Sequence, residues 1–228
     1  MKLLHSALGI LFSFCLIILL LITSVEAVAY WMPGYYEKEY EKYQVTEAVH
    51  MDMEDLLEVT EEMMDYLRGD REDLHIMTTV NGVSREFFNE REIAHMEDVR
   101  GLFLSAIALR RVCLGICAIC IAGLFLLKAK IKKVLPLCIC IGTGLFFAVI
   151  CTLAALISTD FTKYFVIFHK IFFNNDLWLL DPATDLLINI VPEPFFVDTA
   201  ARIALVFGVC VAVIFLGSLF LLKNQKKK

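Results

Sequence analysis

Four long apolar runs constrain the fold of this 228-residue chain more than any other feature. They cover residues 7–29, 102–127, 134–158 and 200–222. A helix needs about 20 apolar residues to cross the hydrocarbon core of a bilayer, and each run is long enough. With 59% hydrophobic residues, the chain is also too apolar for a soluble domain. The sequence therefore predicts an α-helical integral membrane protein with four transmembrane helices.

The first run also has features of a signal peptide. The basic Lys2 precedes it, and Ala27-Val28-Ala29 is a small-residue sequence of the kind that is cleaved. However, the apolar run is longer than a usual signal core. We therefore favour an uncleaved membrane anchor, and cleavage stays the alternative.

The charged residues predict the orientation of the four helices. Lysines flank alternate ends of the runs, at positions 2, 128, 130, 132, 133, 223 and 226–228. All 26 acidic residues fall in the other segments, from Glu26 to Asp98 and from Asp160 to Asp198. Because lysines gather on the cytoplasmic side, both termini are expected in the cytoplasm. Residues 30–100 would then form a small extracellular α/β cap, and residues 159–199 an extracellular aromatic segment at the membrane interface. No basic patch interleaved with aromatics supports nucleic-acid binding.

The cap sequence predicts a helix, a β-hairpin and a second helix. Residues 51–67 show amphipathic spacing and end before Gly69, which favours a helix with a glycine cap. The pair Asn81-Gly82 between two β-prone runs predicts a hairpin with a type I′ turn. Asn89 with Glu92 forms a capping box, and the helix that starts there carries His95 into the second span. The tyrosines of residues 30–40 are expected to form an aromatic belt at headgroup level.

The aromatic segment should contain a short helix on the membrane surface. Asp181 and Pro182 are typical of an N-cap and a first helical residue, and the helix would run to about Ile190. Asp198 is expected to cap the fourth span. Arg110 and Arg111 lie near the predicted outer interface, where they either snorkel to water or bind a phosphate or carboxylate at headgroup level.

Two histidines at the predicted boundary between cap and membrane suggest proton-transfer chemistry. His95 has Glu92 and Asp98 one helical turn away, so a carboxylate could hold its ring and favour the protonated form. His169 lies among phenylalanines, which favour the neutral form. A pair of titratable groups with contrasting pKa values is a pattern of acid–base catalysis.

Other chemistries have weaker support in the sequence. The two histidines with Asp98 or Asp176 could bind a metal, but no HExxH or paired histidine motif is present, and we expect neither metal nor cofactor. No G-x-S-x-G motif indicates a serine hydrolase. All eight cysteines lie in the predicted spans, where Cys117-x-x-Cys120 suits apolar packing better than redox chemistry.

Two long motifs resemble those of a known family. EREIAHMEDVRGLF, from Glu90 to Phe103, and FHKIFFNNDLWLLDPATDLLINIVPEPFF, from Phe168 to Phe196, are similar to the signature blocks of the bacterial lipoprotein intramolecular transacylases. The similarity extends over almost the whole chain, with Arg100 where the family pattern has lysine. It implies an enzyme of the bacterial plasma membrane whose catalytic histidines are His95 and His169.

The resemblance also implies the substrate and the reaction. The enzyme would bind diacylated lipoproteins, whose N-terminal cysteine carries an S-diacylglyceryl group and a free α-amine. It would move the sn-2 acyl chain onto that amine, giving an N-acylated lyso-form, with no covalent enzyme intermediate. The alternative is a non-enzymatic four-span adaptor or sensor that displays an acidic cap.

The protein is expected to act as a monomer in contact with membrane lipid. The residues themselves suggest how the two histidines share the proton transfers. His169 would accept the proton of the amine, and His95, oriented by Glu92 or Asp98, would protonate or steady the ester oxygen. An aromatic wall would confine the glyceryl and acyl groups. Its predicted members are Phe165, Phe168, Phe172, Phe173, Trp178, Phe195 and Phe196.

Overall fold

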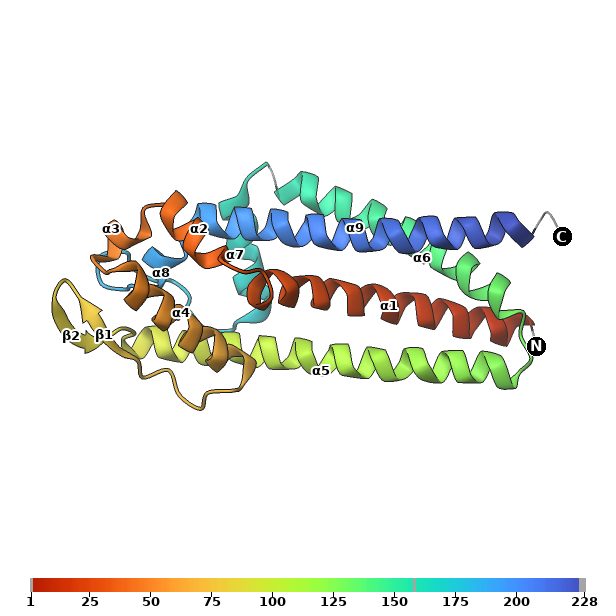
Figure 1. Cartoon of the computed structure of the whole chain (residues 1–228), viewed down its shortest axis with the longest axis horizontal. Coiled ribbons are helices and arrows are strands. Elements are labelled where there is room, and N and C mark those ends of the chain that lie inside the picture. The colour runs from red at the N-terminus through yellow and green to blue at the C-terminus, as the bar shows by residue number, and fades with distance from the viewer. Residues whose placement is uncertain (1, 158, 226–228) are drawn as a thin grey trace. The chain divides into compact units, whose positions relative to one another are not determined.

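A computed structural model describes residues 2–157 and 159–225 of the chain, which are mostly helical (Figure 1). The predicted last residue of the third span, Ser158, and Lys226, Lys227 and Lys228 lie outside the described residues. The elements are α1 (Lys2–Tyr30), α2 (Tyr35–Lys42), α3 (Val45–Val49), α4 (Met53–Arg68), β1 (Met77–Val80), β2 (Val83–Glu86), α5 (Glu90–Leu126), α6 (Ile131–Ile157), α7 (Phe161–Phe172), α8 (Leu187–Ile190) and α9 (Glu193–Gln225).

Four helices, α1, α5, α6 and α9, are long and apolar enough to cross a membrane. They contain 29, 37, 27 and 33 residues. Contacts divide the chain into two compact units. Unit 1 comprises Met1–Ala27, Ile107–Asp160 and Arg202–Lys228, and unit 2 comprises Val28–Ala106 and Phe161–Ala201. Helices α1, α5 and α9 each contribute residues to both units.

One core cluster of unit 1 combines thiol side chains with large apolar ones on facing helices. Cys15 of α1 packs in one cluster with three cysteines on α5, at positions 113, 117 and 120. The Sγ of Cys117 lies 3.7 Å from the Phe12 carbonyl oxygen of α1. At Gly142 of α6, an added methyl group would collide with the Ser13 hydroxyl of α1. These contacts fit the prediction that the cysteines are packing residues.

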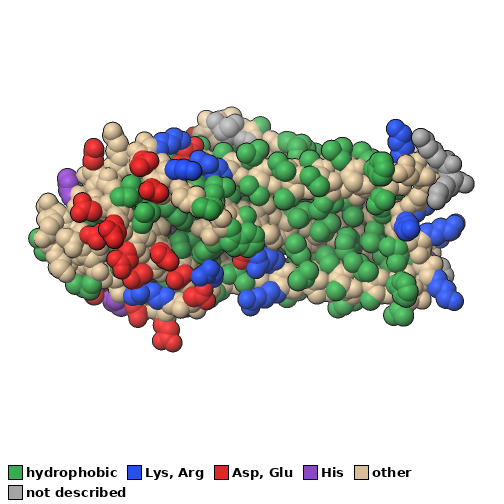
Figure 2. All heavy atoms as spheres, viewed as in Figure 1, with side chains coloured by type: hydrophobic (Ala, Val, Ile, Leu, Met, Phe, Trp, Pro, Cys, Tyr) green, Lys and Arg blue, Asp and Glu red, His purple; other side chains and the backbone are tan. Residues whose placement is uncertain are grey.

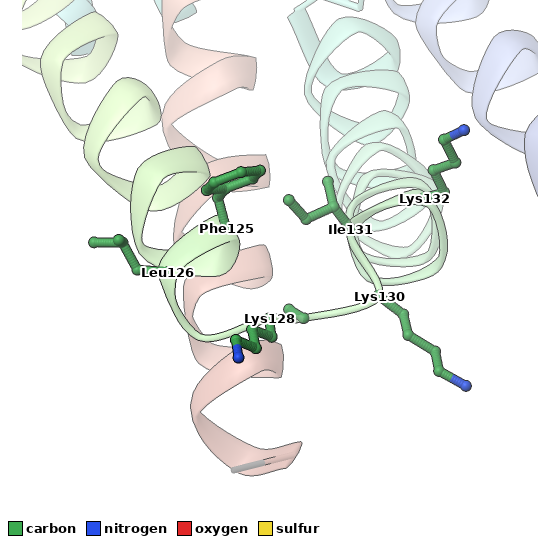
Figure 3. Close-up of a pocket in the computed structure, with 7 residues that line it drawn as sticks. Phe125, Leu126, Lys128, Lys130, Ile131 and Lys132 are labelled. Carbon is green, nitrogen blue, oxygen red and sulfur yellow. The ribbon is translucent and has the colours of Figure 1, made fainter.

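A hollow of about 700 Å³ lies in the turn between α5 and α6 of unit 1. Figure 3 shows Phe125 and Ile131 on opposite sides of this hollow, while the side chains of Lys130 and Lys132 point away from it. Its lining residues include no histidine or carboxylate. The hollow therefore lacks the imidazole and carboxylate groups that the sequence predicts for the site.

Unit 2 contains the β-hairpin that the sequence predicts. β1 and β2 pair antiparallel, with Val80 opposite Val83. Asn81 and Gly82 both have positive φ, 53° and 74°, which is the geometry of a type I′ turn. The amphipathic helix α4 ends at Gly69, whose φ of 89° places it in the left-handed region. Both predictions are confirmed.

The two units differ sharply in charge. Every acidic residue except Glu26 and Asp160 belongs to unit 2, whereas more than half of the lysines and arginines belong to unit 1. Figure 2 shows acidic side chains gathered over the small helices of unit 2, and hydrophobic side chains along the helices of unit 1. The net charge of −5 is therefore an average over an acidic unit 2 and a more basic unit 1, and it describes neither unit.

The predicted aromatic belt is wrong for two of its tyrosines. Tyr35 and Tyr40 are buried in unit 2. Tyr40 shares a hydrogen bond of 2.7 Å with the Thr60 hydroxyl, and its ring stacks on Phe195. These rings pack between α2, α4 and the start of α9 because a small unit rich in acidic residues needs large apolar side chains for its core.

The end of the aromatic segment also differs from the prediction. Asp181 and Pro182 form a turn, and the helix begins only at Leu187. The turn is held by the Asp185 carboxylate, which accepts a hydrogen bond of 2.7 Å from the Asp181 backbone N–H. Asp198 is no cap, because α9 already starts at Glu193. Its carboxylate instead pairs with Lys42 and accepts a hydrogen bond from the Tyr43 hydroxyl.

Candidate active site

The first histidine lies near the N-terminus of α5, behind a complete capping box. The Asn89 side-chain oxygen accepts hydrogen bonds from the backbone N–H groups of Arg91 and Glu92, at 2.9 and 3.0 Å. The Glu92 carboxylate in turn accepts one from the Asn89 backbone N–H at 2.7 Å. The predicted capping box is therefore confirmed. It fixes the first turn of the helix, and His95 follows one turn later.

Glu92 also holds a second helix. Its other carboxylate oxygen accepts a hydrogen bond of 2.6 Å from the backbone N–H of Leu187, the first residue of α8. The side chain is almost fully buried, and burial raises the pKa of this carboxyl group against the opposing effect of its backbone hydrogen bonds. Both oxygens of Glu92 thus bind backbone N–H groups, so it joins α5 to α8 and does not orient His95.

The second histidine lies in the last turn of α7. His169 Nδ1 is 2.8 Å from the backbone carbonyl oxygen of Phe165, four residues earlier. A carbonyl oxygen can only accept, so Nδ1 must carry the hydrogen in this bond. The lone pair of the neutral ring is then on Nε2. His169 is therefore held in the tautomer that a general base requires.

The structure brings the two histidines together within unit 2. Their ring centroids are 6.1 Å apart, and each residue is only 7% exposed. Phe173 contacts both rings, with centroid distances of 5.4 Å to His95 and 5.6 Å to His169. Two helices far apart in sequence thus place both imidazoles close enough to act on the same group.

Only part of the predicted aromatic wall surrounds the histidine pair. Four of its rings contact the His169 ring, with centroid distances from 4.1 to 5.6 Å, and these are Phe165, Phe168, Phe173 and Trp178. Phe196 packs on Phe165 and forms a second layer. Phe172 is half exposed and contacts Phe168. Phe195 points into the tyrosine core around Tyr35 and Tyr40, so the histidine pair is not its environment.

Burial keeps both histidines neutral. It lowers the pKa of His95 to about 4, helped by the neighbouring His169 and Arg91 and opposed by Asp98. Burial also lowers the pKa of His169, against the effect of the hydrogen bond to Phe165. The prediction of a neutral His169 is confirmed. Asp98 favours the protonated form of His95, as predicted, but the expected protonated ring is wrong, because desolvation outweighs the charge of Asp98.

The two nitrogens of His95 have different surroundings from those of His169. His95 Nδ1 is buried and has no hydrogen-bond partner among the described residues. The Asp98 carboxylate, predicted to hold this ring, instead accepts a hydrogen bond of 2.8 Å from the Asn175 side chain. Arg91 donates to the backbone carbonyl of Asp176. Sequence reasoning missed Arg91 and Asn175, although both lie inside the two motifs that carry the family resemblance.

The predicted headgroup residues lie elsewhere, in unit 1. Arg110 forms an ion pair with Glu26 of α1, and Arg111 is exposed. An ion pair explains how Arg110 is accommodated in a membrane helix. Among residues 2–157 and 159–225, no group of three or more histidine, cysteine and acidic side chains could hold a metal ion. The metal alternative therefore finds no support in this part of the chain.

Comparisons with known proteins agree on one family. The family model of the lipoprotein intramolecular transacylase Lit matches residues 10–196. The solved structure of the lipoprotein intramolecular transacylase Lit from Bacillus cereus is similar to the chain, with 21% sequence identity, a TM-score of 0.82 and coverage of 100% of both chains. A variant of that protein with a histidine replaced by alanine has 21% identity and a TM-score of 0.77, covering 98% of this chain and 96% of that chain. No curated protein matches the chain.

Proposed function

The chain belongs to the lipoprotein intramolecular transacylase family, and we propose that His95 and His169 carry out the proton transfers of its reaction. In that reaction, the sn-2 acyl chain of a diacylglyceryl lipoprotein moves onto the α-amine of the lipoprotein's own N-terminal cysteine. The product is an N-acylated lyso-form lipoprotein. An enzyme of this family is not a passive adaptor, so that alternative is set aside.

The tautomer of His169 is the observation that carries the proposal. With Nδ1–H bonded to Phe165, the lone pair of Nε2 is free to take a proton from the attacking amine. The amine nitrogen of the lipoprotein attacks the ester carbonyl carbon, and a tetrahedral intermediate forms. When this intermediate collapses, the bond to the sn-2 oxygen breaks, and protonated His169 returns its proton to that oxygen. The reaction therefore needs no net proton and no nucleophile from the enzyme.

His95 has a different part in this proposal. A buried N–H without a partner is costlier than a buried lone pair, so we place the hydrogen of His95 on Nε2 and leave Nδ1 unprotonated. The neutral ring then donates its Nε2–H to the oxygen of the tetrahedral intermediate. This replaces the protonated His95 expected from sequence, because a pKa of about 4 leaves the ring neutral near pH 7.

The aromatic rings would provide orientation. Phe165, Phe168, Phe173 and Trp178 enclose His169, and they would limit where the glyceryl and acyl groups can lie. Ester-to-amide transfer is favourable, so the obstacle is the approach of the two groups. Holding them in a reactive geometry can contribute about 7–11 kcal/mol in ideal cases.

The test is an assay of purified protein with a diacylated lipopeptide. Substrate and product have the same mass, so tandem mass spectrometry must locate the amide-linked acyl chain, and an amine reagent must show loss of the free α-amine. We expect His169→Asn to abolish turnover and His95→Asn to reduce it strongly. The assigned roles are wrong if His169→Asn keeps full turnover while His95→Asn loses it.

The same proposal includes an orientation in a bacterial plasma membrane. Unit 2 would form the extracellular α/β cap, with both termini cytoplasmic, a monomer as the working unit and α7 at the membrane interface. The outward face of α7 supports this placement, since Ile171 is 71% and Phe172 52% exposed. A membrane-impermeant maleimide should label Glu58→Cys on intact cells but not Gln225→Cys. Labelling of the second variant alone would reverse the orientation.

A further inference from the structure

The segment that follows α7 carries two of the rings at the site, although it has no regular secondary structure. Phe173 contacts both histidines, and Trp178 lies with its ring centroid 4.8 Å from that of His169. Local hydrogen bonds shape the turn between them. The Trp178 indole N–H donates to the Asn175 carbonyl oxygen at 3.0 Å, and the Leu177 backbone N–H donates to the Asn175 side chain at 3.1 Å. Asn175 is thus the centre of the turn.

Two side chains of α5 hold this turn from outside. The Asn175 amide donates a hydrogen bond of 2.8 Å to the Asp98 carboxylate. Arg91 donates to the backbone carbonyl of Asp176, and its guanidinium lies 3.8 Å from the Asp176 carboxylate. Residues 91, 95 and 98 are spaced by four and three positions, so they share one face of the helix. The two anchors therefore lie one turn before and one turn after His95.

We propose that Arg91 and Asp98 are positioning residues that hold the turn at residues 175–178, and thereby fix Trp178 against His169 and Phe173 between the two histidines. The proposal rests on the proposed function of the pair. The anchors are exposed or half-exposed at their outer ends, where such pairs contribute little to global stability. Their effect is local, because they tie an irregular segment to the helix that carries the other histidine.

The competing explanation is that Asp98 acts by its charge on His95. Two matched variants separate the two roles. Asn175→Ala removes the hydrogen bond from the loop side and leaves the charge of Asp98 in place. Asp98→Asn removes the charge but keeps an amide oxygen that can accept from Asn175. Asn174→Ala changes an exposed neighbour and serves as the control.

The first measurement is kinetic, with the diacylated lipopeptide as substrate. We expect Asn175→Ala to lower kcat by about tenfold with little change in KM, since the rings around the reacting groups lose their fixed positions. Asp98→Asn should stay close to the wild-type rate, as should Asn174→Ala. If Asp98→Asn loses activity while Asn175→Ala keeps it, Asp98 acts by charge and the proposal is overturned.

The second measurement needs no substrate, so it is independent of the proposed function. The chain has two tryptophans, and Trp31→Phe leaves Trp178 as the only one. In that background, Asn175→Ala and Asp98→Ala should shift the Trp178 emission to longer wavelength and increase its quenching by acrylamide. Asp98→Asn and Asn174→Ala should change neither.

Thermal unfolding of each variant shows whether it folds. An unchanged Trp178 signal in folded Asn175→Ala would overturn the proposal, even if the enzyme is active. Conversely, if the Trp178 signal shifts in Asn175→Ala while the wild-type protein shows no acyl transfer, that result would support the positioning role and reject the proposed function.

Discussion

The two compact units differ in the polar groups that they bury. Among the described residues, the buried polar side chains of unit 1 are hydroxyl groups, those of Ser13, Ser24, Thr143 and Ser218. Unit 2 buries one hydroxyl group, that of Thr60, and in addition the carboxylates and imidazoles of Glu39, Glu92, His95, His169 and Asp185. Burying an ionisable group is expensive unless it is hydrogen-bonded or kept neutral. The comparison teaches that the cost is concentrated in the unit that holds the candidate active site, while unit 1 follows ordinary membrane packing.

The largest effect is expected from the histidines. His169→Ala should reduce kcat by about 10²- to 10⁴-fold, because it removes the imidazole whose Nε2 is proposed to accept the proton of the amine. If the pair works as a unit, the double variant with His95→Ala should be little worse than the more damaging single one. Steady-state kinetics of the three variants on one lipopeptide measures this. Multiplicative losses would show that the histidines act independently.

Part of the fold of both units could be predicted from the sequence. Local sequence patterns predicted the Asn81-Gly82 turn, the glycine at the end of α4 and the capping box at Asn89, because each depends on residues within a few positions. The apolar runs were sufficient for the four long helices, since length and hydrophobicity alone decide whether a helix can span a bilayer.

What failed depends on contacts between distant segments. Glu92 and Asp98 are each one turn from His95, and spacing on a helix suggested that they hold its ring. The structure gives them other partners, the Leu187 backbone and the Asn175 amide, which lie far away in sequence. The pKa of His95 was mispredicted for the same reason, since the burial that lowers it depends on residues from the whole of unit 2. Asp181 failed as a helix cap because Asp185 folds the backbone there into a turn.

The next effect tests unit 1, where packing should matter and chemistry should not. A methyl group at Gly142 would collide with the Ser13 hydroxyl and lie 3.2 Å from its Cβ, so Gly142→Ala should destabilise the protein by about 1–3 kcal/mol. Gly144→Ala is the matched control, because nothing lies within 4 Å of the added group. Thermal unfolding in detergent gives the difference. The folded fraction of both variants should keep the wild-type kcat, and a specific loss of kcat in Gly142→Ala would break the comparison.

A smaller effect should separate two adjacent phenylalanines of unit 2. Phe173 is buried and contacts both histidines, whereas Phe172 is half exposed and contacts Phe168. Phe173→Leu should lower kcat by about tenfold, since the shorter side chain no longer holds both rings. Phe172→Leu should change kcat little. Equal losses in the two variants would mean that the outward face of α7 takes part in catalysis as much as the inward one.

The smallest effect concerns protons and stability. The folded pKa of His95 is about 4, and its unfolded pKa is about 6.5. Between these values the unfolded chain binds a proton that the folded chain excludes, so acid favours unfolding, and this part of the stability is lost as the pH falls from about 6.5 to about 4. Other groups of unit 2 titrate as well, since hydrogen bonds lower the pKa of Asp185 although burial raises it, and burial raises that of Glu92.

For this reason the test of the proton effect is a difference between two proteins. Thermal unfolding of the wild type and of His95→Gln is compared at pH 7 and pH 5.5. The midpoint of the wild type should fall further, by an amount equivalent to about 1 kcal/mol, because glutamine has no proton to gain. Identical falls would mean that His95 is solvated like an exposed histidine. The buried neutral imidazole that distinguishes unit 2 would then be absent, and the neutral donor proposed for the tetrahedral oxygen would lose its basis.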